Sequence, residues 1–299
     1  MISPLDTQPT DIQISEAFEG VKEALREFSL PSFSDQLQVE RYIERFGIRE
    51  LCHALEKDRV NSAASALHKT VSGSEEKPFE PEYDDLCRLH WICMSRKTIN
   101  VLEFGSGFST AIIADAMRQL SQHFGVWAAR NLRAEQPFHV YAVEEDRKFQ
   151  QITIDRLADP LSNFATVSCS SVDLQMYDDH FSTVYSKIPN ICPDFIYLDG
   201  PSQFATTQEV NGFSFCSQAR MPMSSDILRL EFFLEPGTLI LVDGRTSNAR
   251  FLRSYLRRNW AYQHDTAGDV HLFELQEAPL GKLNGKKLNF CLDNKWLLC

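Results

Sequence analysis

The sequence predicts an α/β protein, in which a mostly parallel sheet with an antiparallel last strand carries helices on both faces. Between residues 84 and 260, continuous apolar runs alternate with helical stretches. This alternation is expected when parallel strands are buried on both faces and connected by helices. After residue 259, two apolar runs are separated by the short turn TAGD. They indicate a hairpin, and therefore a reversed final strand.

Seven segments are the expected strands of this sheet. The first five are apolar runs that end at or near a turn signal, and the last two form the hairpin. They are residues 99–104, 139–144, 165–169, 194–199, 238–243, 260–265 and 270–277.

Residues 1–80 are predicted to form a helical region beside a sheet domain that spans residues 81–299. Apolar residues recur at steps of three and four in residues 11–28 and 34–57. Ser34 is the expected N-cap of the second stretch. Residues 71–83 are rich in Ser, Gly, Pro and Glu, which is typical of a linker. A cap, a dimerisation element and a substrate cover stay open as roles for the helical region.

Charge and cysteine spacing limit the expected partners. The 299 residues carry 41 acidic and 30 basic side chains, a formal net charge of -11, so nucleic acid is not expected to bind. The eight cysteines form no CxxC pair, which disfavours a zinc site, and reduced thiols suit a cytoplasmic protein. The polar N-terminus is unlike a signal peptide, and no apolar run approaches the ~20 residues of a membrane span. We expect a cytoplasmic protein that does not enter a membrane.

The stretch VLEFGSGFST, residues 101–110, places an acid and two glycines between a strand and a helix. Ligands of open α/β sheets bind beyond the carboxyl ends of strands. Gly105 and Gly107 permit a sharp turn and close approach of a ligand, and the helix N-terminus favours a carboxylate or phosphate. The dinucleotide fingerprint GxGxxG fails because Thr110 occupies its third glycine position. A tight turn without a ligand stays open for this stretch alone.

Three further strands deliver a carboxylate to the same edge. Glu144, Asp199 and Asp243 end the second, fourth and fifth strands. A carboxylate at residue 144 can accept hydrogen bonds from both hydroxyls of a ribose. Isolated surface acids, the alternative, would not be expected to fall so regularly at strand ends.

Four stretches taken in order resemble the motifs of class I S-adenosylmethionine-dependent methyltransferases. They are VLEFGSGFST, VYAVEED, DFIYLDGP and GTLILVDGR, and the resemblance covers roughly residues 84–277. It implies a Rossmann-like, seven-stranded sheet whose last strand is reversed, as the final hairpin suggests. The implied function is methyl transfer from S-adenosylmethionine to a small-molecule acceptor, at oxygen or nitrogen.

The resemblance also implies which residues bind the cofactor. The methionine part would meet Glu103, the two glycines and two helix residues, the ribose would meet an acid, and the adenine would lie after the third strand. In chain order these residues are Glu103, Gly105, Gly107, Ser109, Thr110, Glu144, Ser171 and Val172.

Two departures from the pattern concern this site. Gly105 and Glu144 are 39 positions apart, against about 20 in usual nucleotide-binding units. Residues 124–138 are therefore expected to be an insertion or a helix extension. Ser109 stands where many members of the family carry a third glycine.

Asp199 and Asp243 are the candidate catalytic residues, because methyl transfer requires an oriented and often deprotonated acceptor. His264 near the hairpin is a third candidate, with a structural turn histidine as the alternative. In the catechol-type O-methyltransferases of this superfamily, the two Asp positions and a following Asn hold a divalent ion. Here Gly244 and Arg245 follow the second Asp, so a metal is not favoured.

Residues 200–224 form a long irregular stretch. Loops of this length inside a compact domain are usually functional, and we expect this one to close over the acceptor. An anionic acceptor could be bound by Arg220, Arg245 and Arg250. The alternative, that these are ordinary surface arginines, is equally well supported by the sequence.

Three classes of function stay open. A small-molecule methyltransferase is preferred. The alternatives are a non-catalytic binding protein of the same fold and a nucleotide-dependent oxidoreductase, against which Glu103 and Thr110 count. A homodimer also stays open.

Overall fold

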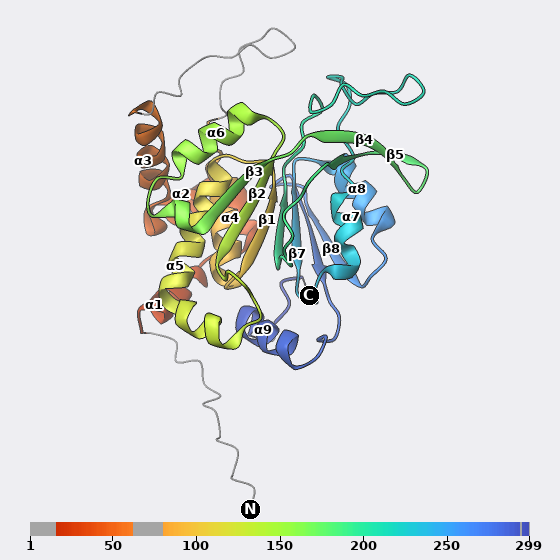
Figure 1. The fold of residues 1–299 in the computed structure, drawn as a ribbon. Helices are drawn as coiled ribbons and strands as arrows, with labels where there is room; N and C mark the ends of the chain where they lie inside the picture. Colours follow the sequence, from red (N-terminus) through yellow and green to blue (C-terminus); the bar gives the residue numbers. More distant parts are fainter. Residues whose placement is uncertain (1–15, 62–79, 294, 299) are drawn as a thin grey trace, which may run out of the picture.

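The structure is a computed structural model, and it describes residues 16–61, 80–293 and 295–298. The described strands form a seven-stranded sheet in the order β3-β2-β1-β6-β7-β9-β8 (Figure 1). The strands are β1 (Asn100–Phe104), β2 (His139–Glu144), β3 (Ala165–Cys169), β6 (Phe195–Leu198), β7 (Leu239–Asp243), β8 (Trp260–Asp265) and β9 (Val270–Leu275). Only β9 runs antiparallel to its neighbours β7 and β8. The predicted Rossmann-like sheet with a reversed last strand is confirmed.

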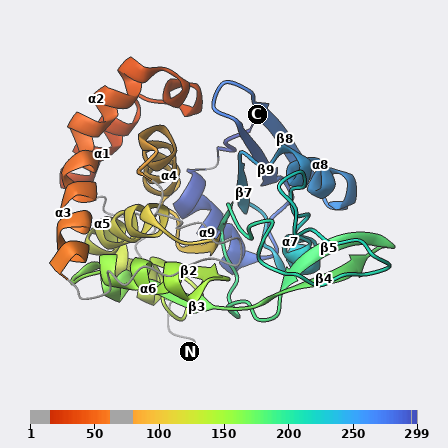
Figure 2. The ribbon, with the colours of Figure 1, turned by 90° about the horizontal axis from the view of Figure 1, so that it is seen from above.

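Helices surround this sheet in the described part of the chain. They are α1 (Glu16–Leu25), α2 (Gln36–Phe46), α3 (Ile48–Asn61), α4 (Tyr83–Ser95), α5 (Phe108–Asn131), α6 (Arg147–Arg156), α7 (Asp226–Leu230), α8 (Thr246–Tyr255) and α9 (Lys282–Leu292). Figure 2 shows α4 and α5 on one side of the sheet and α7 and α8 on the other.

Successive residues of the central strands belong to different cores, which shows that both faces of the sheet are covered. Val101 packs in a core with α4 and α5, whereas Leu102 packs in a second core with α7 and α8. Leu241 and Val242 of β7 alternate in the same way. This alternation explains why the central strands are mostly apolar on both faces.

The N-terminal helices differ in detail from the prediction. Gly47 adopts a left-handed conformation (φ 66°) and ends α2, so the single helix expected over 34–57 is two helices. The predicted N-cap Ser34 is wrong, because Ser34 closes a short 3₁₀ helix. Asp35 caps α2 instead, and its carboxylate accepts the Leu37 N–H at 3.0 Å.

The N-terminal helices form an outer row along α4 and α5 (Figure 2). The Phe18 ring contacts the Phe124 ring of α5 edge to face, with 4.6 Å between the ring centroids. The Tyr42 hydroxyl shares a 2.7 Å hydrogen bond with His90 of α4. Both regions contribute to one continuous core. The division into residues 1–80 and 81–299 stays a prediction, and the linker expected at 71–83 lies mostly outside the described residues.

The unusual spacing between Gly105 and Glu144 results from a helix extension. Helix α5 has 24 residues and reaches Asn131, so most of the segment 124–138 is helical. Its last turns are held by α9, where the Trp127 ring stacks on Phe290 at 4.6 Å. The added length therefore extends away from the strand ends and leaves the turn after β1 in place.

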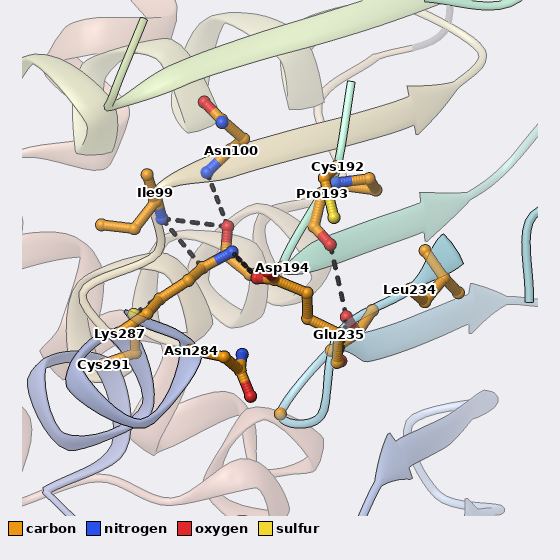
Figure 3. Close-up of polar contacts among 12 residues, drawn as sticks. Ile99, Asn100, Cys192, Pro193, Asp194, Leu234, Glu235, Asn284, Lys287 and Cys291 are labelled. Atoms are coloured by element: carbon orange, nitrogen blue, oxygen red, sulfur yellow. Dashed lines mark hydrogen bonds and ion pairs between the residues drawn. The ribbon is translucent and has the colours of Figure 1, made fainter. Parts of the chain in front are cut away.

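Helix α9 also closes the opposite edge of the sheet, where the strands begin (Figure 3). Asp194 precedes β6, and its carboxylate accepts the N–H groups of Ile99 and Asn100 at 2.9 and 2.6 Å. Cys291 of α9 lies 3.9 Å from the same carboxylate. These contacts fix the start of β1 relative to β6, and so position the ends of both strands.

A second, two-stranded sheet was not predicted from the sequence. Strands β4 (Val172–Tyr177) and β5 (His180–Tyr185) pair antiparallel. Their turn consists of Asp178 and Asp179, both with positive φ, as a two-residue hairpin requires. The predicted irregular stretch 200–224 contains no helix or sheet strand, and it packs on this hairpin, where Phe213 stacks on Phe181 at 4.4 Å.

None of the described helices combines the length and the apolar character needed to cross a bilayer. The described cysteines form no disulfide bonds with one another. Cys192 lies next to apolar residues in the sequence, but its side chain is exposed.

Candidate functional site

A cavity of about 340 Å³ opens at the carboxyl ends of the strands. Its walls come from the start of α4, the turn after β1, one face of α6, and the ends of β6 and β7. The lining residues are Glu80, Pro81, Glu82, Asp85, Leu86, Leu89, Ser106, Gly107, Phe108, Ser109, Phe149, Ile152, Thr153, Arg156, Tyr197, Asp199, Asp243 and Gly244. The sequence predicted this edge of the sheet as the binding edge.

The two glycines of the turn after β1 have different structural roles. Gly105 has φ +105°, a region that disfavours side chains, and a Cβ atom there would lie 3.4 Å from the Gly200 nitrogen. Gly107 is extended, and a Cβ atom there would have no described atom within 4 Å. Its N–H donates to the Thr110 hydroxyl at 3.1 Å. Gly105 therefore shapes the turn, whereas Gly107 leaves open space beside the cavity.

Glu103 lies beneath this turn and is fully buried. Its Oε1 accepts a hydrogen bond from the Ser109 hydroxyl at 2.5 Å, whereas its Oε2 has no partner among the described residues. Burial raises the pKa of Glu103 to about 8, against the opposing effect of the Ser109 and Thr110 hydrogen bonds. An unpaired buried carboxylate oxygen is costly. Glu103 itself does not line the cavity, and neither do Gly105 and Thr110; Glu103 is connected to the cavity through Ser109.

Glu144 lies directly behind the cavity wall at the end of β2. The Ser106 hydroxyl donates to its Oε2 at 2.8 Å and lies 3.1 Å from the Thr153 hydroxyl, and both of these residues line the cavity. The Asp146 N–H donates to Oε1 at 3.1 Å. Burial, followed by the charge of Glu145, raises the pKa of Glu144 to about 7.

Asp199 and Asp243 both line the cavity, as the strand-end argument predicted. The Tyr197 hydroxyl donates to Asp243 Oδ2 at 2.5 Å. The Asp199 side chain is 55% exposed, and the Arg245 guanidinium lies 3.7 Å from its carboxylate. Arg245 also donates to the Pro201 carbonyl at 2.7 Å.

Both carboxyl groups have raised pKa values. Partial desolvation by the surrounding walls raises the pKa of Asp199 to about 7 although its side chain still contacts water, with Arg245 opposing and Asp243 contributing. Burial likewise raises the pKa of Asp243, against the Tyr197 hydrogen bond. Shifts of this kind are frequent where a group exchanges a proton with a ligand.

Several residues singled out in the sequence do not line the cavity. Ser171 is exposed and shares a 2.7 Å hydrogen bond with the Ser186 hydroxyl, and Val172 is buried in the core next to the hairpin. His264 lies in β8 rather than in the turn, and its ring stacks on His271 at 3.9 Å. Arg220 is exposed beside Phe213 at 4.7 Å.

Helices supply two site residues that the sequence did not reveal. Asp85 of α4 lies close enough to Asp243 for their charges to interact; its pKa is raised to about 8, first by burial and then by Asp243, with Arg88 opposing. Arg156 of α6 stacks on the Phe108 ring at 3.9 Å and donates to Glu56 at 2.9 Å. An acidic first turn such as that of α4 ordinarily indicates only a helix start.

The strand-end acids do not form a fitting site for a divalent cation. Asp243 is bound to Tyr197 and Asp199 faces Arg245, and no group of three His, Cys, Asp or Glu side chains in the described ranges could hold a metal ion. Arg245 supplies positive charge beside the position where the resemblance implies a metal ligand.

No protein-family model matches the chain, and no curated protein sequence matches it. Solved structures with a similar fold include the O-methyltransferase TomG from Streptomyces achromogenes in complex with SAM (14% identity, 75% of this chain and 90% of that chain, TM-score 0.38). A second is the O-methyltransferase from Bacillus cereus in complex with SAH (12% identity, 75% of this chain and 90% of that chain, TM-score 0.37). A third is the SAH-bound Podospora anserina methyltransferase PaMTH1 (11% identity, 76% of this chain and 88% of that chain, TM-score 0.42).

The strand order, the reversed β9 and the glycine turn after β1 are read from the structure itself. They define a Rossmann-like α/β fold with a reversed last strand, which is the fold that the sequence resemblance to class I S-adenosylmethionine-dependent methyltransferases implies.

Proposed function

We propose that the chain transfers a methyl group from S-adenosylmethionine to a small-molecule acceptor. The observation that carries this proposal is the turn after β1: Gly107 and Ser109 line the cavity, and the Ser109 hydroxyl is held by the buried Glu103, whose Oε2 is unpaired among the described residues. A ligand with a cationic amine and a carboxylate fits that place, because the start of α5 offers free N–H groups nearby. The methionine part of S-adenosylmethionine has both groups.

The cofactor would supply an electrophilic methyl group, and the chain's own residues would hold and orient it. Glu103, Gly105, Gly107, Ser109 and Thr110 would hold the methionine part. The hydrogen-bonded Glu144 would accept the ribose hydroxyls, since each carboxylate oxygen can accept more than one hydrogen bond.

The adenine is proposed to lie near Ser171 and Val172. The Ser170 N–H donates to the Glu144 carbonyl at 2.9 Å, so this segment follows directly beside the proposed ribose acid.

Asp199 and Asp243 would orient the acceptor or take its proton. Both reach the cavity from neighbouring strands, and both have raised pKa values, with that of Asp199 at about 7. A general base works best with a pKa near the operating pH. The cavity volume of about 340 Å³ falls in the range of small-molecule sites, which supports a small acceptor.

Thermal unfolding with added ligands tests the cofactor assignment. A ligand at 100 times its Kd stabilises the fold by about 2.7 kcal/mol, which for a chain of 299 residues is a rise in Tm of about 4 °C. S-adenosylmethionine and S-adenosylhomocysteine should give this rise, and NAD should not. A rise with NAD alone would favour the oxidoreductase alternative.

Methyl uptake from labelled S-adenosylmethionine, screened over small acceptors, tests the reaction itself. Labelled product would establish turnover. Cofactor binding without uptake across the screen would favour the non-catalytic binding protein.

A further inference from the structure

The wall of the cavity is strongly acidic on the side away from α6. Three of its acids are exposed, two before α4 and one directly after β6, and two are partly buried, on α4 and β7. We call this set the acidic wall; it consists of Glu80, Glu82, Asp85, Asp199 and Asp243. These residues come from three separate parts of the chain, so the fold rather than a local run of sequence brings them together.

Basic side chains do not balance this wall. Arg156 is the only basic residue among the described residues that line the cavity, and it is bound to Glu56 on the opposite side. Arg88 donates to Asp85 and Arg245 lies beside Asp199, both from behind the wall. Even when these three arginines are counted, the carboxylates outnumber the guanidinium groups.

The remaining lining is largely apolar. Leu86 and Leu89 of α4 face the cavity from one side, and Phe108, Phe149 and Ile152 border it from α5 and α6. A molecule that fills such a cavity needs an apolar body and a positively charged end, because burying carboxylates without a counter-charge is unfavourable.

We propose that the methyl acceptor is a primary or secondary amine on an apolar body, and that its nitrogen binds against Asp199 and Asp243. This inference rests on the proposed methyl transfer and specifies its substrate class. It applies to the same cavity and goes beyond the choice between oxygen and nitrogen.

The proposed reaction requires one proton transfer and one displacement. The bound ammonium gives a proton to the Asp199 carboxylate. The neutral nitrogen then forms a bond to the methyl carbon with its lone pair, as the carbon–sulfur bond breaks and the sulfur keeps the electron pair. The products are a methylated ammonium ion and S-adenosylhomocysteine, and Asp199 returns its proton to water.

The acidic wall favours this reaction over methylation of a hydroxyl group. Positive charge moves from sulfur to nitrogen during the displacement, so carboxylates beside the nitrogen stabilise the transition state. A phenol or alcohol would have to become an anion before it attacks, and the same carboxylates would raise its pKa.

Proton release gives a readout that does not depend on turnover. The pKa of Asp199 is raised by desolvation and by the neighbouring Asp243, Glu82 and Glu145, with Arg245 opposing. Asp199 is therefore partly protonated near neutral pH. A bound cation favours the carboxylate form, so an amine should expel protons from the site, whereas a neutral alcohol should not.

The test uses the full chain loaded with S-adenosylhomocysteine and matched probes that differ only in the polar group. One set is phenethylamine, 2-phenylethanol and phenylacetate, and a second is tryptamine, tryptophol and indole-3-acetate. Isothermal titration in phosphate and in Tris at pH 7.5 gives both the affinity and the number of protons released. We expect each amine to bind at least about tenfold more tightly than its alcohol, as a charge-assisted hydrogen bond implies, with proton release for the amines only.

Three variants make the test specific. Asp199→Asn and Asp243→Asn should each weaken amine binding by about tenfold or more and leave alcohol binding unchanged. Asp179→Asn in the β4–β5 turn is the matched control, because it makes the same charge change outside the cavity, and Asn also tolerates its positive φ. All three variants should retain wild-type affinity for S-adenosylhomocysteine, which shows that they are folded.

Equal binding of amines and alcohols, or no amine-selective binding at millimolar probe, overturns the inference. So does a loss of amine affinity in Asp179→Asn equal to that in the wall variants. If S-adenosylhomocysteine fails to bind the wild-type chain, the proposed function itself fails. If it binds but the hydroxyl probes are preferred, only the amine acceptor is wrong.

Discussion

Gly105 and Gly107 should respond in opposite ways to substitution, because only Gly105 has a strained backbone. At φ +105° an alanine costs about 1–3 kcal/mol. The added Cβ would also lie 3.4 Å from the Gly200 nitrogen, which leaves little room for relaxation. For 299 residues the unfolding entropy of about 2.1 cal/mol/K per residue converts this cost into a Tm lower by about 2–5 °C.

Gly107→Val should have the reverse effect. Its backbone is extended and no described atom lies within 4 Å of an added Cβ, so the main cost to folding is the loss of a preferred N-cap residue, at about 1 kcal/mol or less. The valine side chain would instead occupy the space proposed for the cofactor. Overpacking of a filled site costs about 1–3 kcal/mol, so affinity for S-adenosylhomocysteine should fall ~10–100-fold.

Calorimetric titration and thermal unfolding on the same preparations measure both effects. Each glycine serves as the control for the other, because one variant reports on folding and the other on binding. Unchanged affinity in Gly107→Val would remove the turn from the cofactor site. A Gly105→Ala protein as stable as the wild type would contradict the strain argument.

Three further substitutions test the groups around the cavity. Glu144→Ala should weaken S-adenosylhomocysteine binding by about 2–4 kcal/mol. Asp146→Ala removes the N-cap of α6 and should mainly lower the free energy of unfolding, by about 1 kcal/mol. If titration shows equal losses of affinity in the two variants, the ribose acid is wrongly assigned. Burial raises the pKa of Glu103 to about 8 from 4.5, so the folded state retains a proton that the unfolded state loses, and stability should fall as pH rises from ~5 to ~8. Denaturant unfolding should show a smaller fall for Glu103→Gln, and equal falls would contradict this reasoning. Arg245→Gln should lower the free energy of unfolding by about 1–3 kcal/mol, because it removes the bond to Pro201 and the cation beside Asp199; Arg245→Lys should restore only part of this in the same denaturant assay.

The strands and their terminal acids were predictable because topology alone determines where strand ends meet. An apolar run such as 139–144 identifies a doubly covered strand, and parallel strands bring their carboxyl ends to one edge. Asp199 and Asp243 therefore lie in the same cavity, although 44 positions separate them in the sequence. The contact between Glu103 and Ser109 follows from the same local turn.

The helical side of the cavity was not predictable in this way. Asp85 reaches Asp243 because α4 begins beside the ends of β6 and β7. Helical periodicity in a sequence predicts which face of a helix is buried, but not the tilt of the helix on the sheet or the level at which it begins. Arg156 lies at the end of α6, where it reads as an ordinary basic residue near a helix C-terminus. The break at Gly47 was visible in the sequence, but a single glycine inside a periodic pattern does not decide between a kink and a helix end.

The contrast between the two halves of the cavity bears on the identity of the acceptor. Most groups proposed for the cofactor come from the turn after β1 and the end of β2, which match the first two motifs of the family resemblance. The acidic wall combines two acids of its later motifs, Asp199 and Asp243, with Glu80, Glu82 and Asp85 at the start of α4. Arg245 lies behind this wall, beside the position where the resemblance implies a metal ligand. With Asp243 bound to Tyr197 and Asp199 facing Arg245, a metal-assisted attack by an oxygen anion lacks its ligands among the described residues. The same acids suit an ammonium group without further change, so the departure from the pattern is itself an argument for a different acceptor.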